Sequence, residues 1–291
     1  MNVPRVTVHI EEQDTATAET LPVVNVSGGK DSTALYLWAI DRYGPDGFLP
    51  IFADTGHEHP VTLNYLRNLP NMAGGPPIVW VRADFADRLA RKELEPTGEP
   101  FLDMARYKGR FPSTKAQFCT EHLKLAPIRA YLAEHHANQD WLILTGIRRG
   151  ESKRRAAYPR DEWHTYFDCW TSRPLLDWST ADVFAFLKAK GVPPNPLYAA
   201  GAGRVGCYPC IHASKAELAS LPEWAWQKLA DWEATLGRTW FPPGTVPGVG
   251  IPTIAQVREW CRTTRGGWQF PLFDEDAKDV PSCMSTWGIC E

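Results

Sequence analysis

The sequence has no long apolar run: none of its stretches approaches the roughly 18 apolar residues that a membrane-spanning helix requires. Its first twenty residues, MNVPRVTVHIEEQDTATAET, also lack the apolar core of a secretion signal. Net charge is small, at -3 over 291 residues, so attraction to nucleic acid would need a local basic patch. These absences predict a cytoplasmic protein with no membrane partner.

Cysteine, in contrast, occurs seven times. Because thiols stay reduced in the cytoplasm, this content favours metal, cluster or redox chemistry over disulfides. Tryptophan is also frequent, with 13 copies, and core packing explains such a number more readily than base stacking does.

Apolar runs of strand length alternate with helix-length segments along most of the chain. We expect strands at 21–26, 48–53, 78–81 and 141–145, and helices at 32–43, from 60 onward, and at 84–94, 120–136 and 182–190. This alternation predicts an α/β fold with a doubly wound parallel sheet, covered by helices on both faces. The strand signal disappears near residue 214, which predicts a helical C-terminal appendage that carries cysteines.

Two other stretches interrupt that rhythm. Residues 1–20 form a polar extension in which 6–10 is a candidate edge strand. Residues 95–118 are predicted to be a long loop, and loops of that length are often functional. This loop carries four basic residues, Arg106, Lys108, Arg110 and Lys115.

A glycine pair lies between the first predicted strand and the first predicted helix, in VVNVSGGKDSTAL. Gly28 and Gly29 let the backbone fold tightly around an anion, and the helix N-terminus offers free N–H groups. Lys30 adds a positive charge, while Ser27 and Ser32 add hydroxyl donors. The spacing differs from the Gly-x-x-x-x-Gly-Lys-Ser/Thr loop of GTPases and from the dinucleotide Gly-x-Gly-x-x-Gly. The segment predicts a phosphate-binding loop of another kind.

The motif SGGKDS, which includes Asp31, resembles the signature of PP-loop ATP pyrophosphatases, enzymes that cleave ATP between its alpha and beta phosphates. The resemblance extends to the branch that contains phosphoadenylylsulfate (PAPS) reductases and the small subunit of ATP sulfurylase. The further matches are IFADTGHEHPVTLNYL, TGIRRGESKRR, RPLLDWSTADVFAFL and NPLY, in the family's order between about residues 20 and 215. The resemblance implies an adenine nucleotide alpha-hydrolase-like fold. It divides the chain into an extension (1–20), a nucleotide-binding domain (21–213) and a helical cap with a Cys tail (214–291).

Physical roles for the matched residues agree with this resemblance. Asp54 ends the second predicted strand, where ligands bind in open parallel sheets, and with Thr55 it would hold Mg²⁺ or the nucleotide. Four arginines follow the strand at 141–145 and would clamp phosphate or sulfate, unless they form an ordinary basic helix face: Arg148, Arg149, Arg154 and Arg155. Lys30, Asp31, Asp54, Arg148 and Arg149 are the predicted catalytic residues. His57 and His59 are equally well explained as solvated loop residues.

Cys207 and Cys210 form a Cys-x-x-Cys pair that suits an iron–sulfur cluster, zinc or a redox couple. Adenylylsulfate (APS) reductases carry Gly-Cys-x-Pro-Cys at this point as [4Fe-4S] ligands, so the resemblance implies a cluster, with zinc as the alternative. Those enzymes have a Cys pair upstream, where this chain has only Cys119. Cys283 and Cys290 are the candidates for a fourth ligand; otherwise one iron stays open. Two further cysteines, Cys169 and Cys261, are expected to be ordinary buried residues.

The resemblance leaves two enzymatic functions open. Reductases usually replace the Gly-Lys of the loop, so Gly29 and Lys30 favour ATP. Reductases also end in Glu-Cys-Gly-x-His, which the tail Gly-Ile-Cys-Glu does not match. We therefore expect an enzyme that binds ATP with Mg²⁺ and adenylates an acceptor, which a sulfur donor protein then attacks. The sequence does not identify the acceptor; the resemblance implies a nucleic acid, as in DNA phosphorothioation or RNA thiolation.

The alternative is a PAPS or APS reductase in which Cys290 or Cys283 attacks sulfur and a thioredoxin-like protein supplies electrons. A non-catalytic nucleotide sensor is a third class, which the complete SGGKDS motif disfavours.

Overall fold

A computed structural model describes residues 20–263 of the chain. Its centre is a six-stranded sheet with the order β3-β2-β1-β4-β6-β5. The strands are β1 (Thr20–Asn25), β2 (Leu49–Asp54), β3 (Val79–Arg82), β4 (Asp140–Leu144), β5 (Asp161–His164) and β6 (Cys169–Ser172). All neighbours are parallel except β5, which runs antiparallel to β6 at one edge. The predicted parallel sheet is confirmed, with an antiparallel edge hairpin that the sequence pattern did not reveal.

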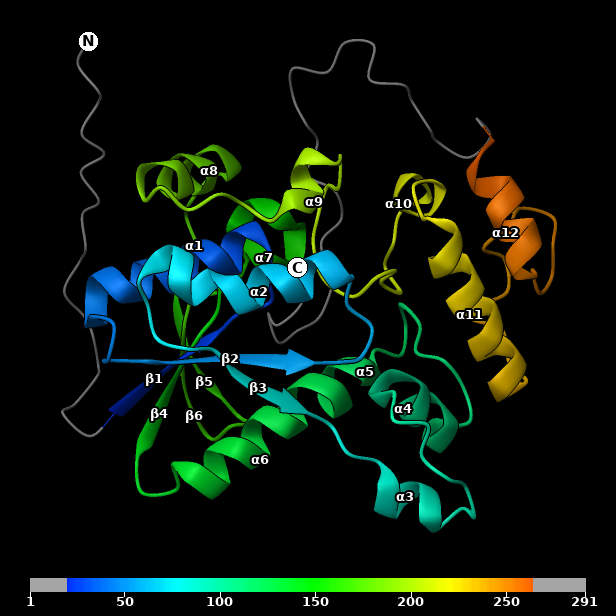
Figure 1. The fold of residues 1–291 in the computed structure, drawn as a ribbon, viewed down its shortest axis with the longest axis horizontal. Helices are drawn as coiled ribbons and strands as arrows, with labels where there is room; N and C mark the ends of the chain where they lie inside the picture. The colour runs from blue at the N-terminus through cyan, green and yellow to red at the C-terminus, as the bar shows by residue number, and fades with distance from the viewer. Residues whose placement is uncertain (1–19, 264–291) are drawn as a thin grey trace.

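Helices cover both faces of this sheet, as Figure 1 shows. On one face lie α1 (Lys30–Tyr43), α2 (Pro60–Ala73) and α8 (Thr180–Ala189); on the other lies α6 (Ala126–His135). The alternation along β1 explains why both faces are covered: Val24 packs into the core under α1, while Val23 packs into the core over α6. A strand buried on both sides is apolar at nearly every position. The doubly wound α/β fold is thus confirmed.

The order in which the chain adds strands to the sheet switches sides at β1. From β1 it proceeds through β2 to β3 on one side, and then returns to place β4, β6 and β5 on the other. In open parallel sheets the carboxyl ends of the strands on either side of such a switch point form the ligand crevice. The ends of β1, β2 and β4 therefore define where a ligand is expected.

The segment from 84 to 118 differs from its prediction. The helix expected at 84–94 is only α3 (Ala86–Ala90), and the predicted loop contains α4 (Pro100–Lys108). Pro100 suits the first position of a helix, and Phe101, Leu102 and Met104 are buried, so apolar packing stabilises α4 where the Pro and Gly content indicated a loop.

The helix predicted at 120–136 is continuous but not uniform. It consists of α5 (Phe118–Thr120), a π-helical turn η1 (Glu121–Leu125) and α6. Pro127 lacks an N–H group and would clash with a carbonyl one turn earlier in a regular helix. The wider π turn directly before it accommodates that missing hydrogen bond.

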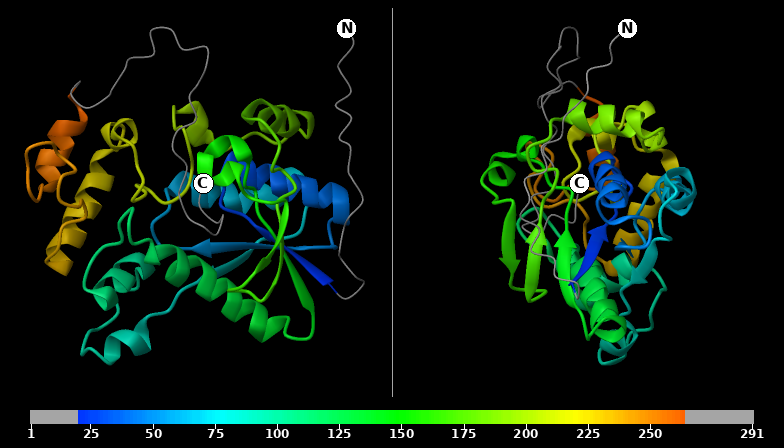
Figure 2. Two further views of the ribbon diagram at one scale, coloured as in Figure 1. Left: turned by 180° about the vertical axis from the view of Figure 1, so that it is seen from behind. Right: turned by 90° about the vertical axis from the view of Figure 1, so that its left-hand side faces the viewer.

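The C-terminal helices form a second core apart from the sheet (Figures 1 and 2). They are α10 (Lys215–Ala219), α11 (Glu223–Leu236) and α12 (Ile254–Cys261). Buried side chains of α11, such as Trp226 and Trp232, join Phe85, Phe101 and Met104 in one apolar cluster. This core draws residues from both sides of position 213, and the domain boundary predicted there stays a prediction. As expected, the described part of the chain has no strand after residue 214.

Three short helical segments complete the fold: η2 (Arg149–Glu151), α7 (Lys153–Ala156) and α9 (Pro196–Ala199). Within residues 20–263, none of the helices has both the length and the apolar character needed to cross a membrane. The candidate strand at 6–10 lies outside the described residues.

Candidate functional site

The predicted phosphate loop joins β1 to α1 at the carboxyl end of the sheet. Gly28 has a φ of +81°, and a Cβ there would lie 2.8 Å from Thr62, so both conformation and space require glycine. Ser32 Oγ accepts hydrogen bonds from the backbone N–H and the hydroxyl of Ser27, each 3.1 Å long, and donates to the Gly29 carbonyl. These bonds hold the loop in its tight turn between strand and helix.

Asp31 lies below this loop and is fully buried. Its carboxylate bonds Lys30 Nζ at 2.8 Å and Arg148 Nε at 2.6 Å, and Arg148 is also buried. The strand-end segment that carries Arg148 approaches closely, since a Cβ on Gly146 would lie 3.0 Å from the backbone of Asp31. Asp31 therefore positions the two cations from beneath the loop, which brings together three of the predicted catalytic residues.

A second segment supports the loop from the side of α9. Asn195 is buried and donates from its amide to the Gly28 carbonyl at 3.1 Å and to Thr62. The Tyr198 hydroxyl accepts a hydrogen bond of 2.9 Å from the Lys30 backbone N–H. Both residues belong to the NPLY motif, to which sequence reasoning assigned no role. The motif is visible in the sequence, but only the fold shows that these two side chains contact the phosphate loop.

The four arginines after β4 divide into two pairs. Arg148 and Arg155 are each 2% exposed, and Arg155 forms an ion pair of 2.6 Å with buried Glu151. Arg149 instead points to the periphery, where it bonds Asp177 and the carbonyls of Ala156 and Tyr158. Arg154 is exposed on α7. Of these arginines, Arg155 lines the cavity beside the loop, and neither Arg149 nor Arg154 does. Arg148 lies beneath the loop, paired with Asp31.

The loop after β2 supplies acidic and hydroxyl groups. Asp54 is partly exposed and accepts from the Gly56 N–H, with Arg82 3.9 Å away. Glu58 accepts a 2.6 Å hydrogen bond from the Thr55 hydroxyl and further bonds from backbone N–H groups. Burial raises the pKa of Glu58 to about 7, although its bond with Thr55 acts in the opposite direction. Glu58 can therefore exchange a proton near neutral pH, a property that was not predicted for it.

His57 differs from the solvated loop residue that was considered for it. It is 1% exposed and lies between Phe101 and Trp232, with ring centroids 4.7 Å away in both cases. Its Nε2 lies 2.9 Å from the Pro209 carbonyl, which can only accept a hydrogen bond, so the neutral ring carries its proton on Nε2. Burial, reinforced by Lys228, lowers the pKa of His57 to about 3, so the ring is neutral in the folded protein. The residue anchors the β2 loop in the second core.

The Cys-x-x-Cys segment pairs with this same loop through its backbone. Glu58 and Cys207 form an antiparallel bridge, and the Tyr208 N–H donates to the His57 carbonyl at 2.6 Å. Thr55 Oγ1 lies 3.8 Å from Cys207 Sγ. The Cys pair thus meets the carboxyl end of the sheet rather than standing apart from the nucleotide-binding motifs.

Three predicted ligands, Cys119, Cys207 and Cys210, line one small cavity together with Lys124 and other residues. Thiols suit zinc and iron–sulfur clusters, so the composition of this cavity fits either group. Within residues 20–263, however, no three His, Cys, Asp or Glu side chains converge as a finished metal site. Cys283 and Cys290, the candidates for a fourth ligand, lie outside the described residues.

A second cavity joins the phosphate loop to the thiols. Cys207 is part of its wall as well, opposite the loop residues Ser27 and Ser32. The remaining wall comes from the ends of β1, β2 and β4 and from three ionisable side chains, Glu58, Lys124 and Arg155. Lys124, 8% exposed, lines both cavities and was not predicted, because a Lys inside a helix carries no local signal of burial.

Comparison with known proteins agrees with this geometry. Residues 21–213 match the phosphoadenosine phosphosulfate reductase domain. The chain belongs to the phosphoadenosine phosphosulfate reductase family. The resemblance drawn from the loop and strand-end motifs is thereby confirmed.

Within this family, the chain is 36% identical to an uncharacterised 37.8 kDa protein of Escherichia phage 186, over 94% of this chain and 97% of that protein. It is 35% identical to the adenosine 5'-phosphosulfate reductase of Allochromatium vinosum, over 44% of this chain and 48% of that enzyme. The chain thus spans about half the length of that reductase. A crystal structure of PAPS reductase from Candida auris has 20% identity and a TM-score of 0.45, covering 67% of this chain and 83% of that one.

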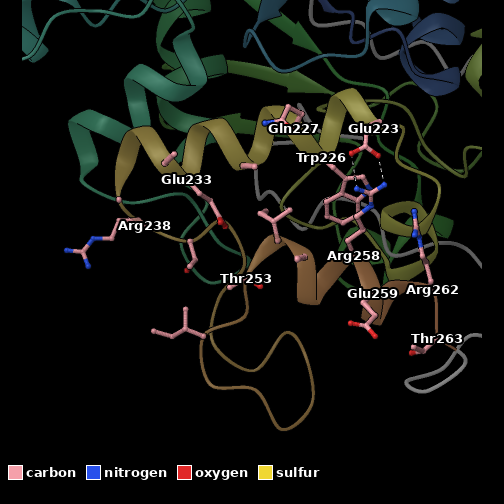
Figure 3. Close-up of a pocket in the computed structure, with 17 residues that line it drawn as sticks. Glu223, Trp226, Gln227, Glu233, Arg238, Thr253, Arg258, Glu259, Arg262 and Thr263 are labelled. Carbon is pink, nitrogen blue, oxygen red and sulfur yellow. Dashed lines mark hydrogen bonds and ion pairs between the residues drawn. The ribbon is translucent and has the colours of Figure 1, made fainter.

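A much larger hollow in the described part of the chain lies elsewhere. It measures about 1200 Å³ and lies between α11 and α12 (Figure 3). Its charges are mixed, and Arg258 bonds Glu223 across it. None of the residues of the phosphate loop or the Cys pair lines this hollow, so volume alone does not identify the site.

The two cysteines that were expected to be ordinary are buried, Cys169 in β6 and Cys261 at the end of α12. Burial raises the pKa of Cys169 to about 12, and that of Cys261 in the same direction. Burial disfavours the reactive thiolate form of both, and the prediction that these two cysteines are buried is confirmed.

Proposed function

We propose that this protein binds ATP with Mg²⁺, cleaves it into AMP and pyrophosphate, and adenylates an acceptor for sulfur transfer. One observation carries the proposal: a complete phosphate loop, with Lys30 at the start of α1, shares a cavity with Cys207. Family membership supports nucleotide and sulfur chemistry in general. The choice of ATP and the cytoplasmic location are part of the proposal.

In this mechanism the phosphates of ATP lie on the N–H groups of Gly28 and Gly29, and Lys30 neutralises their charge. Arg148 and Arg155 are held rigid by buried acids, so they stabilise charge that develops at the alpha phosphorus without reorganising. Asp54, at the end of β2, is the proposed Mg²⁺ ligand. An acceptor oxygen attacks the alpha phosphorus, a new P–O bond forms, and pyrophosphate leaves.

The thiol cavity provides the sulfur side of the reaction. Cys119, Cys207 and Cys210, with Cys283 or Cys290, would hold a [4Fe-4S] cluster, with zinc as the alternative. A bound cluster would supply an iron site for sulfur or electrons. Buried Lys124 adds a positive charge between the two cavities, which would hold an anionic group there.

In the second step of the proposed reaction, a sulfur nucleophile displaces AMP from the adenylated acceptor. A sulfur nucleophile from a donor protein attacks the adenylated carbon or phosphorus of the acceptor, a bond to sulfur forms, and AMP leaves with the oxygen. If the acceptor is a nucleic acid, the basic segment 106–115 is its proposed contact, since Lys108 and Arg110 lie over the Phe118 ring beside the thiol cavity.

Similarity to adenosine 5'-phosphosulfate reductases favours a second candidate function. In that reaction a cysteine thiolate attacks the sulfur of PAPS or APS, and the nucleotide leaves. Thiols of a thioredoxin-like protein then reduce the cysteine S-sulfonate and release sulfite. This reaction requires no ATP.

Anaerobic purification followed by iron and sulfide analysis tests the proposal, together with pyrophosphate release from ATP in the same sample. Iron and sulfide with acceptor-stimulated pyrophosphate release would support adenylation. Sulfite from PAPS or APS without ATP cleavage would establish the reductase instead. Cys207→Ser is expected to lose most of the bound metal, whereas the matched control Cys169→Ala keeps it because Cys169 is buried in β6.

A further inference from the structure

Asn25, the last residue of β1, has a buried and unsatisfied side chain. It is 7% exposed, and neither Nδ2 nor Oδ1 has a hydrogen-bond partner in the described part of the chain. A buried amide normally has its donor and acceptor paired, because leaving them unpaired costs free energy. Such an exception in a native fold needs an explanation, and a bound ligand supplies one where the group lines a cavity.

The side chain belongs to the cavity beside the phosphate loop. Asn25 lines that cavity together with Ile51 and Ala53 of β2. On the adjacent strand, Thr145 directly follows β4 and has a buried hydroxyl without a partner as well. The open space measures about 30 Å³, which one or two water molecules fill. A purine is larger than this space, so a planar ligand that lies along the crevice would displace these waters with one edge only, and that edge would reach the amide.

The position fits the base of a nucleotide better than its phosphates. Asn25 precedes Ser27 by two residues, about 7 Å along an extended strand, so a nucleotide whose phosphates lie on the loop extends its base toward the strand end. An amide is neutral and offers one donor beside one acceptor. Adenine presents the complementary pair, its 6-amino group next to a ring nitrogen, as Asn recognises it in nucleic acids.

We infer that Asn25 reads the base of the bound nucleotide and selects a 6-aminopurine over a 6-oxopurine. The inference rests on the proposed function only in that the site takes an adenine nucleotide. It assigns the selection to one side chain rather than to the shape of the crevice.

Calorimetric titration with AMP and with IMP tests this role, because the two differ at the 6-position. AMP is part of ATP, APS and PAPS alike, so the result does not depend on which of them is the substrate. We expect the wild type to bind AMP at least about tenfold more tightly than IMP, within the 5- to 150-fold range of one paired amide. Asn25→Leu, of similar size, is expected to bring the ratio close to one, mainly by weakening AMP.

Thr171→Val is the matched control, since Thr171 lies on β6 with the same kind of buried, unpartnered hydroxyl and does not line the cavity. It should keep the AMP:IMP ratio. If Asn25→Leu does not fold, the smaller Asn25→Ser is measured instead. An unchanged ratio in either variant, or an equal loss of AMP and IMP, would overturn the inference. Absence of ATP cleavage with an intact AMP:IMP ratio would count against the proposed function alone.

Discussion

The phosphate loop and the thiol cavity lie side by side but are assembled in different ways. The loop consists of six consecutive residues, Ser27 to Ser32, between one strand and one helix. The thiol cavity combines segments far apart in the chain: Thr55 and Cys207, which touch, are separated by 152 positions. A local motif can specify the first, whereas the second exists only once the second core has formed.

The two regions are also stabilised by different forces. Beneath the loop, buried ion pairs fix the cations, with Asp31 between Lys30 and Arg148. Beneath the thiols, aromatic packing around His57 anchors the segment that pairs with Cys207. The phosphate side therefore depends on charge, and the thiol side on burial, which perturbation experiments can separate.

The largest effect is expected from the buried ion pairs. Asp31→Asn removes the carboxylate and leaves Arg148, 2% exposed, without its anion, so stability should fall by about 3–5 kcal/mol. Urea unfolding measures this loss. Asp177→Asn is the control: it breaks pairs of a carboxylate that is 54% exposed, and should cost about 1 kcal/mol or less. Equal losses would mean that burial does not govern the phosphate side.

Loss of the loop cation should impair the reaction rather than the fold. We expect Lys30→Ala to slow pyrophosphate release by about 100- to 1,000-fold, because a preorganised charge on the phosphates disappears. Steady-state rates measure this, and Lys188→Ala, on an exposed position of α8, is the control. A rate within a few-fold of wild type would remove Lys30 from the mechanism.

On the thiol side, the expected signature is a dependence on pH. The pKa of His57 is about 3 in the fold and ordinary in the unfolded chain, so only the unfolded state takes up a proton as pH falls below about 6.5. The contribution of neutral His57 to the free energy of unfolding is complete above about pH 6.5 and is lost progressively as the pH falls toward 3. Between pH 7 and pH 5 the wild type should lose about 2 kcal/mol more than His57→Phe in chemical denaturation.

Neighbouring ionisable groups do not cancel the expected difference in pH dependence between the wild type and His57→Phe. Lys228 reinforces the low pKa of His57, and Glu58, whose pKa is raised to about 7, contributes stability that is lost as pH rises through that value. Both are present in wild type and variant, so the difference isolates His57. Asn138→Ala, at an exposed position that does not titrate, should leave the pH slope unchanged. The same slope in wild type and His57→Phe would contradict a buried neutral ring.

The smallest effect is expected at the periphery of the arginine cluster. Arg149 is 41% exposed and bonds Asp177, so Arg149→Ala should cost about 1 kcal/mol or less. Because Arg149 bonds Asp177 and two carbonyls rather than the phosphate loop, pyrophosphate release should fall far less than in Lys30→Ala. A rate loss as large as that of Lys30→Ala, at unchanged stability, would restore the catalytic role that the sequence predicted for it.

Local patterns were sufficient for the sheet and the loop, since Val23 and Val24 indicate a strand buried on both faces and Gly28 a tight turn. They were insufficient where tertiary packing dominates. The apolar residues of α4 outweigh the breakers around them, and His57 shows no local sign of the rings that enclose it. Lys124 and Asn195 became site residues only through contacts across the fold.

Cys207 lines both cavities, and this affects how a reactive group would pass from one cavity to the other. Cys207 and Lys124 line both the anion-binding cavity and the thiol cavity, so the two are neighbours with part of a wall in common. A labile sulfur species handled at the thiols would be one side chain away from a group activated on the phosphate loop. Under the proposed function, transfer between the two cavities would then be a form of channelling, because the reactive group would cross one shared wall.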